Sequence, residues 1–197
     1  MTIKKLALMA VLTAIALIIF IVEAQIPLPI PVPGMKLGLA NTVTLFALFF
    51  GVKNHPDSEG KTDEPTPCLL PCLHYFTTGN VLAILLCRIF LGAMFTGRLV
   101  AFIYSIAGGL LAFTAMVIMK RFVTDKQIWV CGAAGAVFHN IGQIIAAILI
   151  TGTPAIAAYL PVLIVTGVFT GVFTGLIAQF TLERLRRARL TQDLNNK

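Results

Sequence analysis

Long apolar runs dominate this chain, and apolar and polar positions do not alternate within them. A helix that crosses a bilayer needs about 20 consecutive, mostly apolar residues. The strands of a membrane barrel would instead place apolar and polar side chains at alternate positions. The pattern therefore predicts six transmembrane helices, over residues 6–22, 37–52, 81–97, 99–119, 129–150 and 155–182.

The six predicted helices leave few of the 197 residues for other structure. We expect an all-α fold, in which a polytopic bundle of six transmembrane helices forms one integral membrane domain over residues 1–197. An unusual polar loop at about 53–80 and a basic tail at about 183–197 lie outside the bundle. In the first connection, residues 25–34, proline recurs at every second position, which makes the segment extended and stiff. That segment is either a rigid connector or a lid over a cavity that faces outward.

Composition agrees with a membrane protein, because 58% of the residues are apolar, 12% are charged and the mean hydropathy is +0.92. A soluble domain carries about 25% charged residues, so a conventional water-soluble enzyme is excluded. With the N-terminus inside, Lys36 and Arg98 fall in outer segments, Arg88 falls within a span, and all other Lys and Arg residues lie in inner segments. The net charge of +7 therefore reports topology rather than a nucleic-acid partner. We expect both termini in the cytoplasm and a multi-pass protein of the plasma membrane.

Polar side chains within the predicted helices are the candidate functional residues, because such groups are costly in a membrane unless they face a cavity or a partner. Their types are two cations, three amides and one imidazole, which suit an anionic or strongly hydrogen-bonding small molecule. The candidates are Lys36, Asn41, Arg88, His139, Asn140 and Gln143. Glu23 is the one acidic residue near enough to balance their charge. The alternative is an internal network that holds the helices together, with Lys36 extending to the outer interface.

Small residues predict where helices pack closely, and Gly167, Gly171 and Gly175 form a double GxxxG pattern. Ala10 and Ala14 give the first helix a face of small residues, which would suit packing within the bundle or docking of another membrane subunit.

Several catalytic motifs do not occur in the sequence. It has no GxxxxGK[ST] motif for ATP, no HExxH or GxSxG motif, and no close pair of aspartates that could hold Mg²⁺. We therefore expect no catalytic residue, no metal site and no cofactor.

Three segments together resemble a family of bacterial membrane proteins, heptaprenyl diphosphate synthase component I, also called Gx transporters. The segments are PGMKLGLAN at 33–41, FIYSIAGG at 102–109 and GAVFHNIGQ at 135–143. This family is similar to the substrate-binding S components of energy-coupling factor (ECF) transporters. The chain departs from the family at residues 54–80, which look like an insertion into a connection that is usually short.

The resemblance implies a six-helix S-component-like bundle in the bacterial inner membrane that binds a vitamin or precursor near its outer face. A separate transmembrane subunit and two ATPases would drive uptake, and Ala10 and Ala14 match the AxxxA motif that docks that subunit. The name of the family implies instead an accessory membrane subunit beside a soluble prenyl diphosphate synthase.

Our leading hypothesis from the sequence is a membrane-embedded binding subunit of an ECF-type uptake transporter. Its solute would be small and anionic, or related to isoprenoids or quinones. The alternatives are a non-catalytic membrane component of a heptaprenyl diphosphate synthase complex and a structural membrane protein without a ligand.

Overall fold

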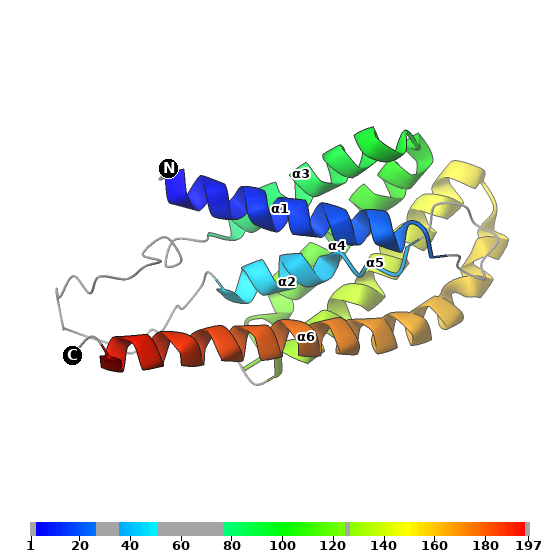
Figure 1. The fold of residues 1–197 in the computed structure, drawn as a ribbon. Coiled ribbons are helices and arrows are strands. Elements are labelled where there is room, and N and C mark those ends of the chain that lie inside the picture. Colours follow the sequence, from blue (N-terminus) through cyan, green and yellow to red (C-terminus); the bar gives the residue numbers. More distant parts are fainter. Residues whose placement is uncertain (1–2, 27–35, 51–76, 125–126, 196–197) are drawn as a thin grey trace.

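The computed structural model describes residues 3–26, 36–50, 77–124 and 127–195 (Figure 1). Every regular element in these ranges is a helix, which confirms the all-α class. The elements are α1 (Ile3–Glu23), α2 (Asn41–Phe50), α3 (Thr78–Thr96), α4 (Leu99–Met119), α5 (Ile128–Thr151), the short 3₁₀ helix η3 (Pro154–Tyr159) and α6 (Leu160–Asn195).

Five of the helices, α1, α3, α4, α5 and α6, are long and apolar enough to cross a membrane. A multi-pass membrane protein is therefore supported. Helix α2 is shorter, with 10 residues. At about 1.5 Å per residue it extends about 15 Å, roughly half the thickness of the hydrocarbon core.

The predicted start of the second helix at residue 37 is wrong, because the chain is not helical before Asn41. Gly38 has a φ of 85°, in the left-handed region that favours glycine, and it turns the chain immediately ahead of α2. Residues 51–52, the predicted end of this helix, lie outside the described residues, as do residues 27–35 of the proline-rich connection and residues 53–76 of the polar loop.

The last helix also differs from the prediction. The segment predicted to begin at residue 155 opens with η3, and Pro154 stands at the first position of that 3₁₀ helix. The following helix, α6, continues to Asn195, so the backbone of the predicted basic tail is helical up to that residue.

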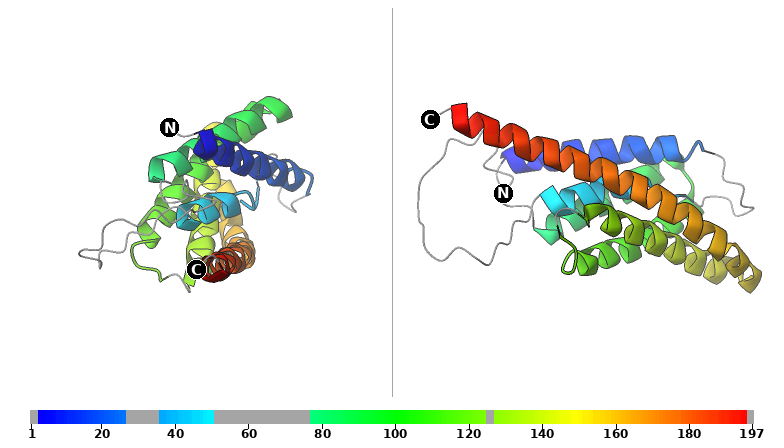
Figure 2. Two further views of the ribbon diagram at one scale, coloured as in Figure 1. Left: turned by 60° about the vertical axis from the view of Figure 1, so that its left-hand side comes forward. Right: turned by 90° about the horizontal axis from the view of Figure 1, so that it is seen from below.

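The shortest helix lies at the centre of the bundle. Helix α2 contacts each of the other five α-helices, whereas α1 packs mainly on α3, and α5 packs mainly on α4 and α6 (Figures 1 and 2). Seven of its ten residues are buried, among them Val43, Leu45 and Leu48. Apolar side chains from the surrounding helices, including Leu85 and Met116, complete a core around it. The central position of α2 places its first residue, Asn41, deep inside the molecule.

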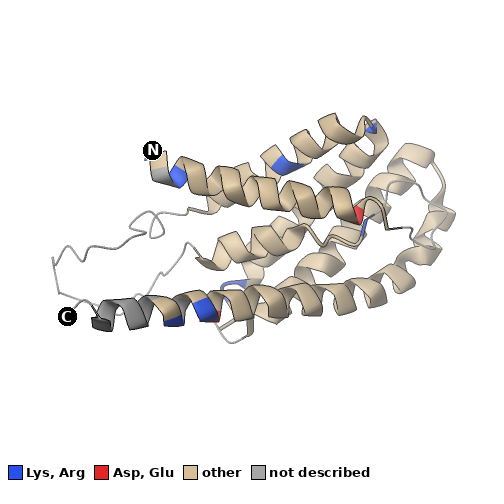
Figure 3. Ribbon diagram, viewed as in Figure 1, with Lys and Arg blue, Asp and Glu red and all other residues tan. Residues whose placement is uncertain are grey.

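The first turn of α1 and the last turns of α6 lie at the same end of the bundle (Figure 1). Described Lys and Arg residues lie at this end on both α1 and α6, and other charged residues lie on α3 and near the end of α1 (Figure 3). The opposite end carries the last turn of α1, the end of α5 and η3, and the start of α2 lies between the two ends (Figure 1).

Helices α5 and α6 approach one another closely along a line of glycines, here called the glycine seam and made of Gly132, Gly171 and Gly175. A Cβ atom added to Gly132 would lie 2.6 Å from the carbonyl oxygen of Gly171. One added to Gly175 would lie 2.6 Å from the Cα atom of Trp129. Both contacts involve backbone atoms, which cannot move aside as a flexible side chain can. The close packing predicted from the GxxxG pattern is therefore confirmed.

Candidate ligand-binding site

Polar side chains from four helices and one turn meet inside the bundle, beside the start of α2. Six residues form this polar cluster, and each is less than 9% exposed although all are charged or strongly polar. They are Glu23, Lys36, Asn41, Arg88, His139 and Gln143. Five of the six candidates from the sequence therefore come together, with Glu23 added.

Glu23 joins the end of α1 to the turn that precedes α2. Its Oε1 atom accepts hydrogen bonds from the backbone N–H groups of Gly38, at 2.5 Å, and Leu39, at 3.1 Å. The carboxylate therefore fixes the backbone at the point where the φ of Gly38 is positive. Reasoning from the sequence had treated Glu23 only as a possible counter-charge, although an acidic residue that ends an apolar run was a visible signal.

A chain of hydrogen bonds connects this turn to α5. The backbone N–H of Lys36 donates to Oε1 of Gln143 at 3.3 Å, and Nε2 of Gln143 lies 3.1 Å from Nε2 of His139. Because an amide nitrogen only donates, Nε2 of His139 must accept, and the imidazole proton is therefore assigned to Nδ1. The i, i+4 spacing of His139 and Gln143 places both side chains on one face of α5.

Two glycines allow the imidazole ring to fit between elements. A Cβ on Gly108 of α4 would lie 2.8 Å from Nδ1 of His139, and a Cβ on Gly38 would lie 2.9 Å from its Cδ2. The glycines of the PGMKLGLAN and FIYSIAGG segments therefore enclose a side chain of the GAVFHNIGQ segment. The three segments quoted for the resemblance are in contact.

The two cations of the cluster lie against the same aromatic ring. Nζ of Lys36 is 2.9 Å from the centroid of the Phe20 ring, and Cζ of Arg88 is 5.8 Å from it. Nη2 of Arg88 also donates to Oδ1 of Asn41 at 3.4 Å. Burial lowers the pKa of Lys36 to about 8, while the nearby Glu23 carboxylate acts in the opposite direction. Lys36 therefore remains mostly protonated at neutral pH.

Asn140 is buried but belongs to a different contact. Its Nδ2 atom donates to the backbone carbonyl of Leu163 in α6 at 2.6 Å, and Gly167 provides the space beside it. It therefore links α5 to α6. Ala10 and Ala14 are exposed on the surface of α1 and are not packed inside the bundle. Their role in docking another subunit stays a prediction.

Several polar atoms of the cluster are buried without a hydrogen-bond partner among the described residues. They are Nζ of Lys36, Nδ2 of Asn41, Nε of Arg88 and Nδ1 of His139. All four are donors in the protonation states assigned above. Buried polar groups normally find partners, so a group of unpartnered donors is a candidate site for a molecule that supplies acceptors.

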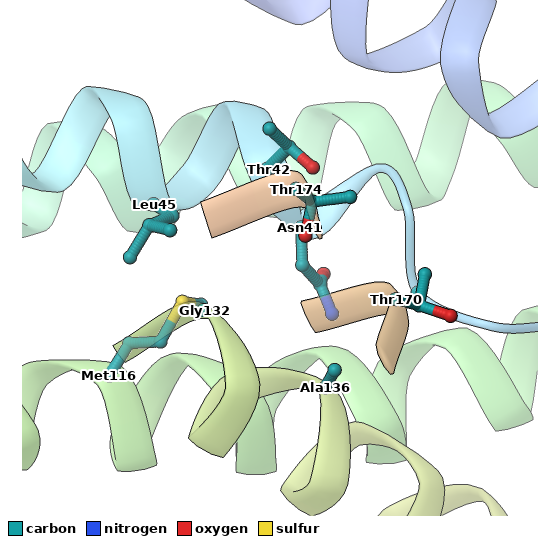
Figure 4. Close-up of a pocket in the computed structure, with 9 residues that line it drawn as sticks. Asn41, Thr42, Leu45, Met116, Gly132, Ala136, Thr170 and Thr174 are labelled. Atoms are coloured by element: carbon teal, nitrogen blue, oxygen red, sulfur yellow. The ribbon is translucent and has the colours of Figure 1, made fainter. Parts of the chain in front are cut away.

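A narrow pocket adjoins the cluster at Asn41 and Gly38, between α2, α4, α5 and α6. The side-chain amide of Asn41 projects into it, toward Ala136 of α5 and Thr170 of α6 (Figure 4). In this conformation the pocket has room for about one water molecule. Its lining residues are Gly38, Asn41, Thr42, Leu45, Met116, Gly132, Ala136, Thr170 and Thr174.

No group of three His, Cys, Asp or Glu side chains that could hold a metal ion is found in the described part of the chain. The cluster contains two cations, neutral amide and imidazole side chains and a single carboxylate, whose Oε1 atom already accepts two backbone N–H groups.

A comparison with protein families finds a match over most of the chain. The model of a family described as heptaprenyl diphosphate synthase component I matches residues 12–55 and 68–181. The gap between the two matched parts, residues 56–67, falls within the stretch that looked inserted in the sequence. Comparisons with curated proteins and with solved structures find no match.

Proposed function

The chain belongs to the heptaprenyl diphosphate synthase component I family, and from that premise we propose that it is a non-catalytic membrane subunit that binds a small solute. The solute is anionic or a strong hydrogen-bond acceptor, and it binds at the polar cluster. The observation that carries this proposal is the set of buried donors without partners, on Lys36, Asn41, Arg88 and His139.

The proposed arrangement in the membrane has six helices, with both termini in the cytoplasm. Helix α2 counts as the sixth and crosses only part of the bilayer on its own. The excess of Lys and Arg in the segments at one end of the bundle supports that end as cytoplasmic (Figure 3). The polar cluster then lies toward the outer face of the plasma membrane.

The first candidate assembly is a heptaprenyl diphosphate synthase complex, which the description of the family supports. In this assembly the chain is the membrane component, and a soluble partner carries out the synthesis. The sequence has no close pair of aspartates for Mg²⁺, which agrees with an accessory role. This candidate predicts that the purified chain binds the soluble synthase and changes its rate or the length of its product.

The second candidate assembly is an ECF-type uptake transporter, and two observations favour it. The polar cluster is built from the segments that resemble this class of binding subunit, and the small side chains of Ala10 and Ala14 are exposed on α1, where a coupling subunit could dock. This candidate predicts that a second transmembrane subunit and ATPases co-purify with the chain, and that Ala10→Leu with Ala14→Leu removes them.

The proposal is tested by mass spectrometry of the small molecules that co-purify with the protein in mild detergent. We expect a solute to accompany the wild type and to be lost from Arg88→Met, which removes the charge and keeps much of the volume. Thr181→Val is the control, because Thr181 is exposed and its hydroxyl bonds only the carbonyl of Ile177 in its own helix. Equal retention in all three proteins would contradict the proposal, and co-purified proteins would distinguish the two assemblies.

A further inference from the structure

The pocket beside Asn41 adds a second recognition element to the polar cluster. Asn41 belongs to both, because its Oδ1 accepts from Arg88 while its side-chain amide projects into the pocket (Figure 4). Its Nδ2 is buried and makes no hydrogen bond to any described residue. A bound molecule could therefore extend from the cations into the pocket and accept a hydrogen bond from Nδ2.

The threonines of the pocket define what else that molecule must offer. The hydroxyls of Thr42, Thr170 and Thr174 donate to the carbonyls of Leu39, Thr166 and Gly171, at 2.6, 2.7 and 3.3 Å. A hydroxyl has one proton to donate and two lone pairs that accept. Each of these oxygens has therefore used its proton and can offer only lone pairs to a ligand.

The pocket consequently combines one free donor, on Asn41, with an acceptor on Thr174, whose hydroxyl lies toward Asn41 (Figure 4). This combination fits a group that both accepts and donates, such as a hydroxyl or a primary amide. It does not fit a second carboxylate or a phosphate, which would bring only acceptors toward the hydroxyl oxygen of Thr174 at neutral pH. The available room, about one water molecule, is the size of a single hydroxyl group.

The buried charges define the other part of the ligand. The buried charged side chains of the described residues are Glu23, Lys36 and Arg88, and the assigned tautomer of His139 is neutral. Their sum is one positive charge. A ligand with one negative charge would neutralise the site, whereas a diphosphate would leave further negative charge buried without a partner, which is costly.

We infer that the site binds a small monoanion that carries a hydroxyl or amide group. The anionic group lies at the cations Lys36 and Arg88, and the hydroxyl or amide lies in the pocket between Asn41 and Thr174 of α6. This inference rests on the proposed function, since it names the class of solute that the same site takes.

The experiment compares four probes on the purified protein in detergent, by calorimetry or by thermal stabilisation. The probes are 3-hydroxybutyrate, butyrate, which lacks the hydroxyl, 3-hydroxybutyramide, which lacks the charge, and geranyl diphosphate. We expect 3-hydroxybutyrate to bind best, about three- to tenfold better than butyrate, which is the effect of one hydrogen bond.

The variant Thr174→Val tests whether the hydroxyl of bound 3-hydroxybutyrate lies in the pocket. This variant should show a smaller preference for 3-hydroxybutyrate over butyrate, because the ligand hydroxyl loses one acceptor and keeps the donor on Asn41, whereas Thr181→Val, the same change at an exposed site of the same helix, should keep the full preference of the wild type. Equal binding of these two probes to the wild type would overturn the inference, and so would an undiminished preference in Thr174→Val or tighter binding of geranyl diphosphate.

The failure of this inference can be told apart from failure of the proposed function. If the wild type binds none of the probes but retains a co-purified solute that Arg88→Met loses, the inference is wrong and the proposed function stands. If no solute is retained and no probe binds, both are wrong.

Discussion

The polar cluster and the glycine seam both include residues of α5, and they are built in opposite ways. At the seam, Gly132 and Gly175 bring backbones so close that an added methyl group would meet main-chain atoms at 2.6 Å. At the cluster, Lys36 and Arg88 are buried with nitrogen atoms that have no hydrogen-bond partner within the described residues.

The difference separates stability from function. Close packing of small residues is what stabilises helices against one another in a membrane, where the hydrophobic effect contributes little. Unpartnered buried donors instead lower stability, so their presence calls for a ligand or another function. Substitutions in the seam should therefore change stability, and substitutions of unpartnered cluster residues should change binding.

The largest loss of stability is expected from substitution of Glu23, because its carboxylate already accepts two hydrogen bonds from the backbone. Glu23→Ala removes the charged acceptor of two backbone N–H groups, which corresponds to about 3 kcal/mol or more. Glu23→Gln should lose less, because the amide oxygen can still accept. Unfolding in detergent measures both variants, and equal stability of Glu23→Ala and wild type would show that this carboxylate does not hold the turn.

A smaller loss of stability is expected in the seam. Gly175→Ala places a methyl group against the backbone of Trp129 and should cost about 1–3 kcal/mol. The matched control is Gly79→Ala in α3, where the added Cβ meets no atom within 4 Å. Because alanine favours a helix, the control should be as stable as the wild type or slightly more stable. Unfolding in detergent measures both variants. An equal change in stability for Gly175→Ala and Gly79→Ala would show that the seam is no more sensitive to an added methyl group than the surface.

Little or no loss of stability is expected when Lys36 is replaced, because its ammonium makes no hydrogen bond to the described residues. Lys36→Met keeps an unbranched side chain against Phe20 and removes a buried ammonium that makes no hydrogen bond to the described residues. Stability should be equal to that of the wild type or higher, while retention of the anionic solute falls. If Lys36→Met unfolds more easily than the wild type and still binds the solute, Lys36 stabilises the fold and does not bind the ligand.

The smallest effect is expected from pH alone. The pKa of Lys36 is lowered to about 8, so its ammonium loses its proton as the pH rises from 7 to 9, and anion binding should weaken over that range. Lys36→Arg should bind with less dependence on pH, because arginine stays protonated. Titration of binding between pH 6.5 and 9.5 measures this, and identical profiles for the two proteins would exclude Lys36 as the titrating group.

The sequence predicted α1, α3, α4 and α5 well, and it predicted the start of α2 and both ends of α6 poorly. Apolar length alone placed one predicted helix at residues 99–119, which coincide with α4. It failed ahead of Asn41, where Gly38 has a positive φ that an α-helix does not allow and Glu23 holds this turn by accepting the backbone N–H groups of Gly38 and Leu39. Local hydropathy contains no information about such a bond between distant residues.

The types of the residues in the sequence indicated the candidate site, and the fold shows which of them lie together. The polar candidates are all buried in the structure, but which partners they contact depends on how the helices pack. His139 and Asn140 are adjacent in the sequence, yet His139 faces Gln143 and the turn before α2, while Asn140 faces α6. Spacing along one helix could not distinguish these two directions. The orientation in the membrane and the docking role of Ala10 and Ala14 stay predictions.

The central claim is that the polar cluster binds an anionic or strongly hydrogen-bonding solute. Its most direct test is the amount of co-purified solute, measured by mass spectrometry on equal quantities of folded wild type, Arg88→Met and Thr181→Val. We predict a solute in wild type and Thr181→Val and its loss from Arg88→Met. A solute retained equally by all three proteins, or found in none of them, would contradict the account.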